Sequence, residues 1–137
     1  MLKFQSDTKM PLALTAIRWV PIRGDSMWPS LRSDDEAGMV RLRVYPKKGQ
    51  IVVARQKNGL VAHRVLCIAG PFVTLAGDNC SRPDVPIPLE NLYGVVLLVR
   101  RRGRVLRRPE WDRGPTALGL LRRRLKQSAR RLRMAVK

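Results

Sequence analysis

The stretch that decides the fold is residues 50–69, "QIVVARQKNGLVAHRVLCIA", in which two β-branched runs flank the dipeptide Asn58-Gly59. Both residues of an Asn-Gly pair tolerate the positive φ angles of a type I′ turn, whose twist matches that of paired strands. We therefore predict an antiparallel hairpin across this turn. A second turn, Ala-Gly-Pro at residues 69–71, pairs the histidine-bearing run with "FVTLAG" at residues 72–77.

Short strands are predicted on both sides of this hairpin. "RWVPI" (18–22) ends an edge strand, and "GMVRLRVY" (38–45) follows it. After a proline-rich loop, "LYGVVLLVRR" (92–101) and "RVLRR" (104–108) are joined near Gly103. Short strands separated by tight turns are typical of antiparallel sheets that coil and close on themselves. The expected fold is mainly β, a coiled, mostly antiparallel, partly closed β-sheet scaffold.

The C-terminal segment has a different period. Its apolar residues recur at a spacing of three or four, as on one face of an α-helix, at Leu118, Leu121, Leu125, Ala129, Leu132 and Val136. The opposite face is almost entirely arginine and lysine. We therefore expect a C-terminal basic amphipathic α-helix. The chain then divides into an N-terminal arm (1–19), a β body (20–108) and a linker with this basic helix (109–137).

The chain is strongly basic. It has 137 residues and a formal net charge of +18, from 28 Lys and Arg against 10 Asp and Glu. Residues 100–137 hold 15 of the basic residues and 2 of the acids. Such a segment attracts phosphate, anionic lipid or acidic protein, because neutralising those groups releases counterions and relieves self-repulsion.

The partners expected for residues 116–137 are therefore an anionic membrane surface or an acidic partner. The alternative is that the helix docks on the body and leaves its basic face in solvent. Nucleic acid is the weaker expectation, because the aromatic residues that stack on bases make up 5% of the chain.

Neither a metal site nor a cofactor is expected. Cys67 and Cys80 have no Cys-x-x-Cys spacing and no clustered histidines, so reduced thiols are predicted. The most apolar N-terminal run, residues 10–22, is interrupted by two prolines and an arginine. It falls short of the ~20 apolar residues that span a bilayer. We expect a soluble cytoplasmic protein, with peripheral attachment to a membrane as the alternative.

Ser26 is a candidate nucleophile. It lies in a turn between Gly24 and Pro29, just after the predicted edge strand. Gly24 lets another backbone approach closely, and such a turn can aim both the Ser26 hydroxyl and its own amide N–H at one point. His63, the single histidine, lies in the second strand of the hairpin. An imidazole with an ordinary pKa near ~6.5 accepts a serine proton at neutral pH.

Two aspartates are candidates for the acid of a triad. Asp78 and Asp84 follow the strand that is predicted to pair with the one bearing His63. A carboxylate there would fix the imidazole tautomer and stabilise the protonated ring. Aspartates are also ordinary turn residues, and the residues alone leave open which acid faces His63.

The candidate residues occur in a specific order along the chain: "GDSMWP", "GQIVVAR", "AHRVL", "AGDN", Asp84 and "LYGVV". Over roughly residues 20 to 100 this order resembles the signal peptidase I and SOS-repressor clan of serine peptidases. The histidine makes it similar to the endoplasmic-reticulum and archaeal type of signal peptidase. The resemblance implies that Ser26 is the nucleophile, His63 the general base in place of a lysine, Asp84 the triad acid and Asp78 a supporting acid.

Some positions depart from the family pattern. Met39 and Gln50 stand where members of the family carry the aspartate of a Gly-Asp pair. Gly24 stands where many have a serine that completes the oxyanion hole, so the Ser26 amide and one further donor would stabilise the oxyanion. The transmembrane anchor of signal peptidases is not recognised in the sequence.

The leading hypothesis is a soluble serine endopeptidase that cleaves a leader or precursor peptide through an acyl-enzyme. The β body would be its catalytic domain, and the peptide would bind as an added strand lined by Ile22, Arg23, Gly24 and Met27. One alternative is an autoproteolytic regulator of the repressor kind, although the 25 residues before Ser26 are too few for a helix-turn-helix domain. The other is an inactive peptidase fold that binds nucleic acid or anionic membrane through its basic tail.

Overall fold

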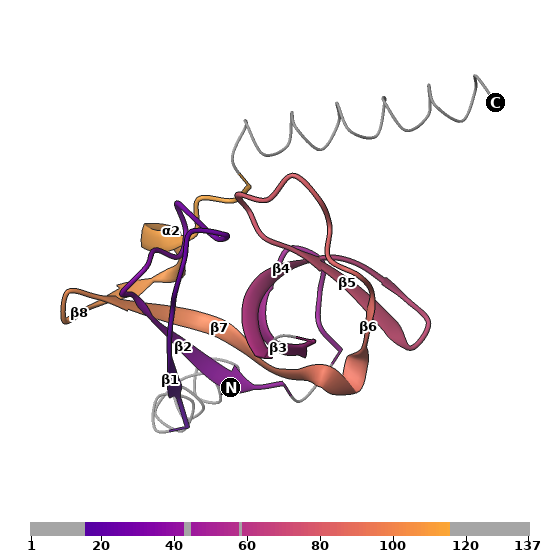
Figure 1. The fold of residues 1–137 in the computed structure, drawn as a ribbon. Helices are drawn as coiled ribbons and strands as arrows, with labels where there is room; N and C mark the ends of the chain where they lie inside the picture. The colour runs from indigo at the N-terminus through magenta and orange to yellow at the C-terminus, as the bar shows by residue number, and fades with distance from the viewer. Residues whose placement is uncertain (1–15, 43–44, 58, 116–137) are drawn as a thin grey trace, which may run out of the picture.

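The computed structural model describes residues 16–42, 45–57 and 59–115 (Figure 1). In these segments the chain forms β1 (Arg18–Pro21), β2 (Glu36–Arg41), β3 (Ile51–Gln56), β4 (Gly59–Ala69), β5 (Phe72–Ala76), β6 (Ile87–Pro88), the 3₁₀ helix η1 (Leu89–Asn91), β7 (Leu92–Arg101), β8 (Arg104–Arg107) and the short helix α2 (Arg108–Trp111). The predicted basic helix after residue 115 and most of the predicted N-terminal arm lie outside the described residues.

The strands of the described segments form one eight-stranded sheet in the order β1-β2-β7-β3-β4-β5-β6, with β8 paired to β7. Every pairing is antiparallel, so the expected mainly β, antiparallel fold is confirmed. The predicted partial closure is wrong: the sheet is open, because β1 and β6 are its two ends and no pairing among the described residues joins them. Its middle is strongly curved, as β4 shows in Figure 1.

The hairpins that the sequence predicts are present. β3 and β4 pair up to Gln56 opposite Gly59, so the hairpin is present but its turn is displaced by one residue from the prediction: Gly59, expected inside the turn, is the first residue of β4. β4 and β5 pair up to Ala69 opposite Phe72, across a turn in which Gly70 has a positive φ of 58°. β7 and β8 form the third hairpin. Local turn chemistry therefore sets three of the connections of the sheet.

The core lies on both faces of β3. Ile51 and Val53 belong to one cluster of buried side chains, and Val52 and Ala54 belong to a second cluster. An uninterrupted apolar run such as "IVVA" is what a strand needs when both of its faces are buried. The first cluster continues into the segment after Ser26 and into α2, through Met27, Leu31 and Trp111.

α2 packs on the sheet although it falls in the predicted linker. Trp111 is 1% exposed, so the chain remains part of the core beyond residue 108. None of the helices in the described part of the chain combines the length and the apolar character needed to cross a membrane.

Candidate active site

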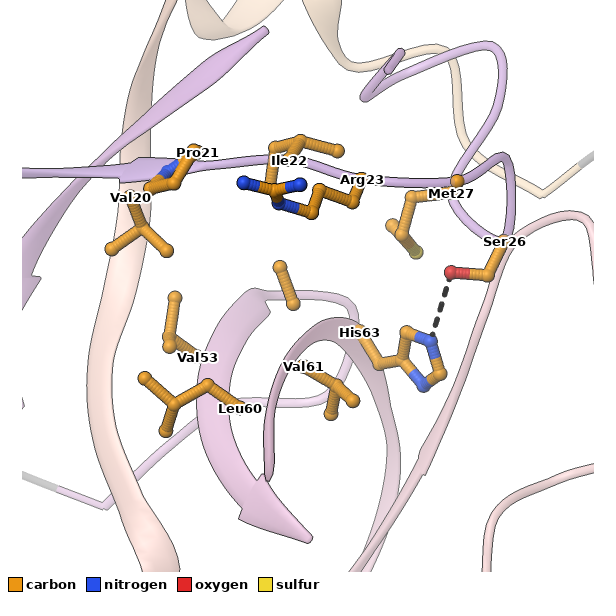
Figure 2. A pocket seen from close by; sticks show the side chains of 12 residues that line it. Val20, Pro21, Ile22, Arg23, Ser26, Met27, Val53, Leu60, Val61 and His63 are labelled. Atoms are coloured by element: carbon orange, nitrogen blue, oxygen red, sulfur yellow. Dashed lines mark hydrogen bonds between the residues drawn. The ribbon is translucent and has the colours of Figure 1, made fainter. Parts of the chain in front are cut away.

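Ser26 lies in the turn between β1 and β2. Gly24 begins this turn with a φ of 79°, and the Trp28 amide donates to the Asp25 carbonyl at 3.0 Å. The expected close approach of another backbone is not found at Gly24, because a Cβ there would meet no atom of the described residues within 4 Å, and the glycine is explained by its positive φ. Met27 is 3% exposed and belongs to the core, so the residue after Ser26 is held by packing. The Ser26 hydroxyl is thereby presented at a fixed place beside β4 (Figure 2).

The loop after β5 holds this turn from the other side. The Asn79 amide donates to the Ser26 carbonyl at 2.9 Å, and the Asn79 side chain donates to the Asp25 carbonyl at 3.2 Å. Gly77 lies so close that a Cβ at this position would be 2.6 Å from the Ser26 carbonyl oxygen. This close approach explains why a glycine stands at position 77, where the "GDN" stretch begins. The two hydrogen bonds from Asn79 fix the backbone carbonyls of Asp25 and Ser26.

His63, on β4, lies between Ser26 and Asp84. Its Nε2 is 3.2 Å from Ser26 Oγ, and its Nδ1 is 2.5 Å from Asp84 Oδ2. When Nδ1 carries the proton and donates it to the carboxylate, Nε2 is free to accept the hydrogen of the serine hydroxyl. His63 is 8% exposed, so little water competes for these contacts. The three residues form one continuous hydrogen-bonded chain.

Asp84, and not Asp78, contacts the imidazole. The Asp84 amide donates to the Leu75 carbonyl at 2.8 Å, which fixes this residue beside β5. Gln56, at the end of β3, donates through Nε2 to Asp84 Oδ2 at 2.8 Å. Sequence reasoning does not find Gln56, because a polar residue at the end of a strand carries no distinguishing signal.

Asp78 binds the neighbour of His63 instead. It is 1% exposed and accepts two hydrogen bonds of 2.7 Å from Arg64, from Nε to Oδ1 and from Nη2 to Oδ2. Arg64 also donates to Asp112 Oδ1 at 2.7 Å and to the Gly49 carbonyl at 2.8 Å. Asp78 is therefore linked to β4 through Arg64, the residue that follows His63.

The charge of Arg64 is stabilised by its partners. Burial lowers the pKa of the guanidinium, but the hydrogen bonds and charges of Asp78 and Asp112 outweigh this effect and hold the pKa above its ordinary value. A buried arginine between two carboxylates is a fixed cation, and removal of one partner leaves an uncompensated charge. This ion-pair cluster connects β4, the loop after β5 and the end of α2.

A cleft of about 360 Å³ leads to Ser26 and His63 (Figure 2). Residues 20–24 form one wall, and residues 60–63 of β4 form the opposite wall. The predicted substrate-binding residues all line this cleft: Ile22, Arg23, Gly24 and Met27. Ser26 thus lies in a mostly apolar cleft between residues 20–24 and residues 60–63.

Both walls of the cleft present strand edges. β5 pairs with β4 only from Arg64 onward, so residues 60–63 have no partner in β5. On the opposite wall, the backbone of Ile22 bonds to Asp34 and Asp35. The N–H and C=O groups of the next residue in an extended backbone point the other way.

The Ser26 amide is a candidate oxyanion donor. It makes no hydrogen bond within residues 16–42, 45–57 and 59–115, and it belongs to the same residue as the hydroxyl that contacts His63. As for a metal, no three His, Cys, Asp or Glu side chains gather as a possible metal site in the segments that the structure describes. A serine hydroxyl, an imidazole and a carboxylate bonded in this order are the groups that acyl transfer to a serine nucleophile requires.

No model of a known protein family matches the chain, and no curated protein is significantly similar to it. Its function is therefore inferred from the residues and the geometry of this site.

Proposed function

We propose that the chain is a serine endopeptidase of the signal peptidase-like kind that cleaves a leader or precursor peptide. The hydrogen-bonded chain from Ser26 through His63 to Asp84 carries this proposal, because it opens on a cleft between two strand edges. The order of motifs along the sequence agrees with it, as does the antiparallel β scaffold.

In the proposed reaction, Ser26 Oγ attacks the carbonyl carbon of the scissile bond while its proton passes to His63 Nε2. The Ser26 amide donates to the oxyanion, and Asp84 stabilises the imidazolium. Collapse of the intermediate expels the amine, which takes the proton from His63. A water molecule, deprotonated by His63, then cleaves the acyl ester and regenerates the Ser26 hydroxyl.

The substrate is proposed to bind as an extended strand between the two walls of the cleft. Its main chain would pair with residues 20–24 or with residues 60–63, and its side chains would meet the apolar lining. The resemblance to signal peptidases implies small side chains at the first and third positions before the scissile bond. The reacting carbonyl would then lie next to Ser26.

The test is cleavage of short synthetic peptides with a central Ala-Xaa-Ala, followed by mass spectrometry. Ser26→Ala and His63→Ala should each lower cleavage by at least ~10³-fold, because each removes a member of the reacting unit. Ser33→Ala is the matched control, since Ser33 is exposed in the same connection between β1 and β2 and makes no side-chain contact among the described residues. Equal cleavage by the wild type, Ser26→Ala and His63→Ala would contradict the proposal.

A further inference from the structure

Among the described residues that line the cleft, Arg23 carries the one permanent charge. Nine of these twelve residues are apolar or glycine, and Ser26 and His63 make the proposed catalytic contacts. Figure 2 shows the Arg23 side chain lying back along the wall of the cleft, toward Pro21 and Ile22, on the side where a substrate strand is proposed to bind. No acidic side chain from residues 16–42, 45–57 or 59–115 is part of the lining. A guanidinium is thus placed where a peptide must pass.

The guanidinium of Arg23 has no partner within the described residues. Other arginines of the body are paired: Arg64 with Asp78 and Asp112, Arg100 with Glu36, and Arg101 with Asp35. Arg23 makes no such ion pair or side-chain hydrogen bond in the part of the chain that the structure describes. No contact among the described residues therefore explains why a charged side chain stands at position 23.

A peptide that fills the cleft must remove water from this guanidinium. Arginine has five N–H donors and cannot lose its proton, so a covering apolar side chain would leave donors unsatisfied. A carboxylate on the peptide would replace the lost water with charge-assisted hydrogen bonds, and the planar fork of arginine favours that partner. A lysine or arginine on the peptide would be repelled.

We propose that Arg23 determines specificity, and that the substrate is a peptide with small apolar residues and one Asp or Glu side chain that meets this guanidinium. The inference rests on the proposed peptidase function and names the substrate class of the same site. The acidic residue lies within a few positions of the scissile bond, because Arg23 is three residues from Ser26. A longer leader or precursor is recognised by this short segment.

The experiment uses peptides with a central Ala-Xaa-Ala in which each flanking position carries Asp in one peptide and Asn in its pair. The wild type should cleave the Asp peptide about tenfold better in kcat/KM at one position, because one charge-assisted pair is gained there. Arg23→Gln should abolish this preference, and Arg23→Glu should reverse it in favour of Lys. Added salt should reduce the wild-type preference.

Arg18→Glu is the matched control, because Arg18 is exposed on β1, carries the same charge and does not line the cleft. This variant should keep the Asp preference. A second readout separates recognition from chemistry: binding of the same fluorescent peptides to Ser26→Ala, with and without Arg23→Glu, by anisotropy. Tighter binding of the Asp peptide that depends on Arg23 supports the inference.

Two outcomes overturn it in distinguishable ways. If Asp and Asn peptides are cleaved and bound equally at every position, or Arg23→Glu keeps the Asp preference, Arg23 does not select the substrate while the peptidase proposal stands. If cleavage is unaffected by Ser26→Ala and no peptide binds, the proposed function itself fails, and the inference fails with it.

Discussion

At the scale of single residues, Asp78 and Asp84 lie in the same loop after β5 but have different partners. Asp84 contacts His63 and is held by Gln56, whereas Asp78 is buried against Arg64. A carboxylate on Nδ1 fixes the tautomer in which Nε2 accepts a proton, and a carboxylate on a buried arginine compensates its charge. Substitution of the two residues should therefore affect different properties of the protein.

Asp84→Asn should lower kcat by up to ~10⁴-fold and leave the free energy of unfolding nearly unchanged, because the amide favours the wrong imidazole tautomer. Asp78→Asn should instead lower the free energy of unfolding by about 3 kcal/mol, since it leaves Arg64 with one carboxylate fewer. Peptide cleavage and urea unfolding of both variants measure the two effects. If Asp78→Asn folds stably but loses most of its kcat while Asp84→Asn remains active, Asp78 and not Asp84 is the acid of the triad.

The sequence identifies Ser26 and His63 because each has a local signal: a glycine-proline turn after an edge strand, and a strand position in an Asn-Gly hairpin. It does not separate Asp84 from Asp78, since both lie in the same irregular loop. The choice depends on the hydrogen bond from the Asp84 amide to the Leu75 carbonyl, which sets the path of the loop back along β5. No residue pattern predicts such a contact.

At the scale of elements, α2 is connected to β4, the strand that carries His63. Asp112, directly after α2, accepts hydrogen bonds from Arg64 on β4 and from Arg108 on α2. Trp111 anchors the same helix in the core. The end of the described chain is therefore linked to β4 next to His63, although nothing in the spacing of the sequence predicts this contact.

The contribution of Asp112 to stability, through its hydrogen bonds with Arg64 and Arg108, depends on pH. Burial raises the pKa of Asp112, but the hydrogen bonds from Arg64 and Arg108 outweigh it and lower the pKa below its ordinary value of 3.8. The folded state therefore favours the carboxylate more than the unfolded state does. Its contribution to stability is complete above the unfolded pKa and is lost as the pH falls through the folded pKa.

Asp112→Asn should lower the free energy of unfolding at pH 7 by about 1–3 kcal/mol, because one partner of Arg64 is lost while Asp78 remains. The difference from wild type should shrink as the pH falls below 3.8. Glu110→Gln is the control, since Glu110 is exposed on the same helix. The side-chain amide oxygen of the introduced glutamine can still accept the hydrogen bond from the Arg107 backbone amide. Urea unfolding at several pH values measures both, and a pH-independent loss would rule out the ion pair as the cause.

At the scale of the whole molecule, the sequence predicts the pairing of strands that follow each other along the chain, but it does not predict the pairing of strands that are far apart in the sequence. The hairpins follow from turn residues and from alternation of apolar side chains. The pairing of β2 with β7, which sets Glu36 opposite Arg100, joins segments far apart in the sequence. The register of these two strands is set by which side chains are buried in the assembled core, so the sequence of either strand alone does not predict it.

Charge is the other property that belongs to the whole molecule. Several arginines of the described body are paired with acids, whereas residues 116–137 hold eight Lys and Arg and no acid. We propose that this segment binds an anionic membrane surface and brings the peptidase to it. Neutralisation of Arg122, Arg123 and Arg124 to Gln in the full chain should then weaken binding to phosphatidylserine vesicles by roughly tenfold or more, because each basic residue near such a surface contributes ~1 kcal/mol.

The matched control for this prediction removes the same charge from separate places, by changing the exposed Arg41, Arg55 and Arg82 to Gln. If attraction comes from the density of charge in residues 116–137, the control should weaken vesicle binding less than the clustered variant does, and both should cleave peptides in solution like the wild type. The binding should also fall steeply with added salt, because the Debye length shortens from about 10 Å at 0.1 M salt to about 3 Å at 1 M. Equal losses from the two triple variants would mean that net charge alone, and not this segment, draws the protein to the surface.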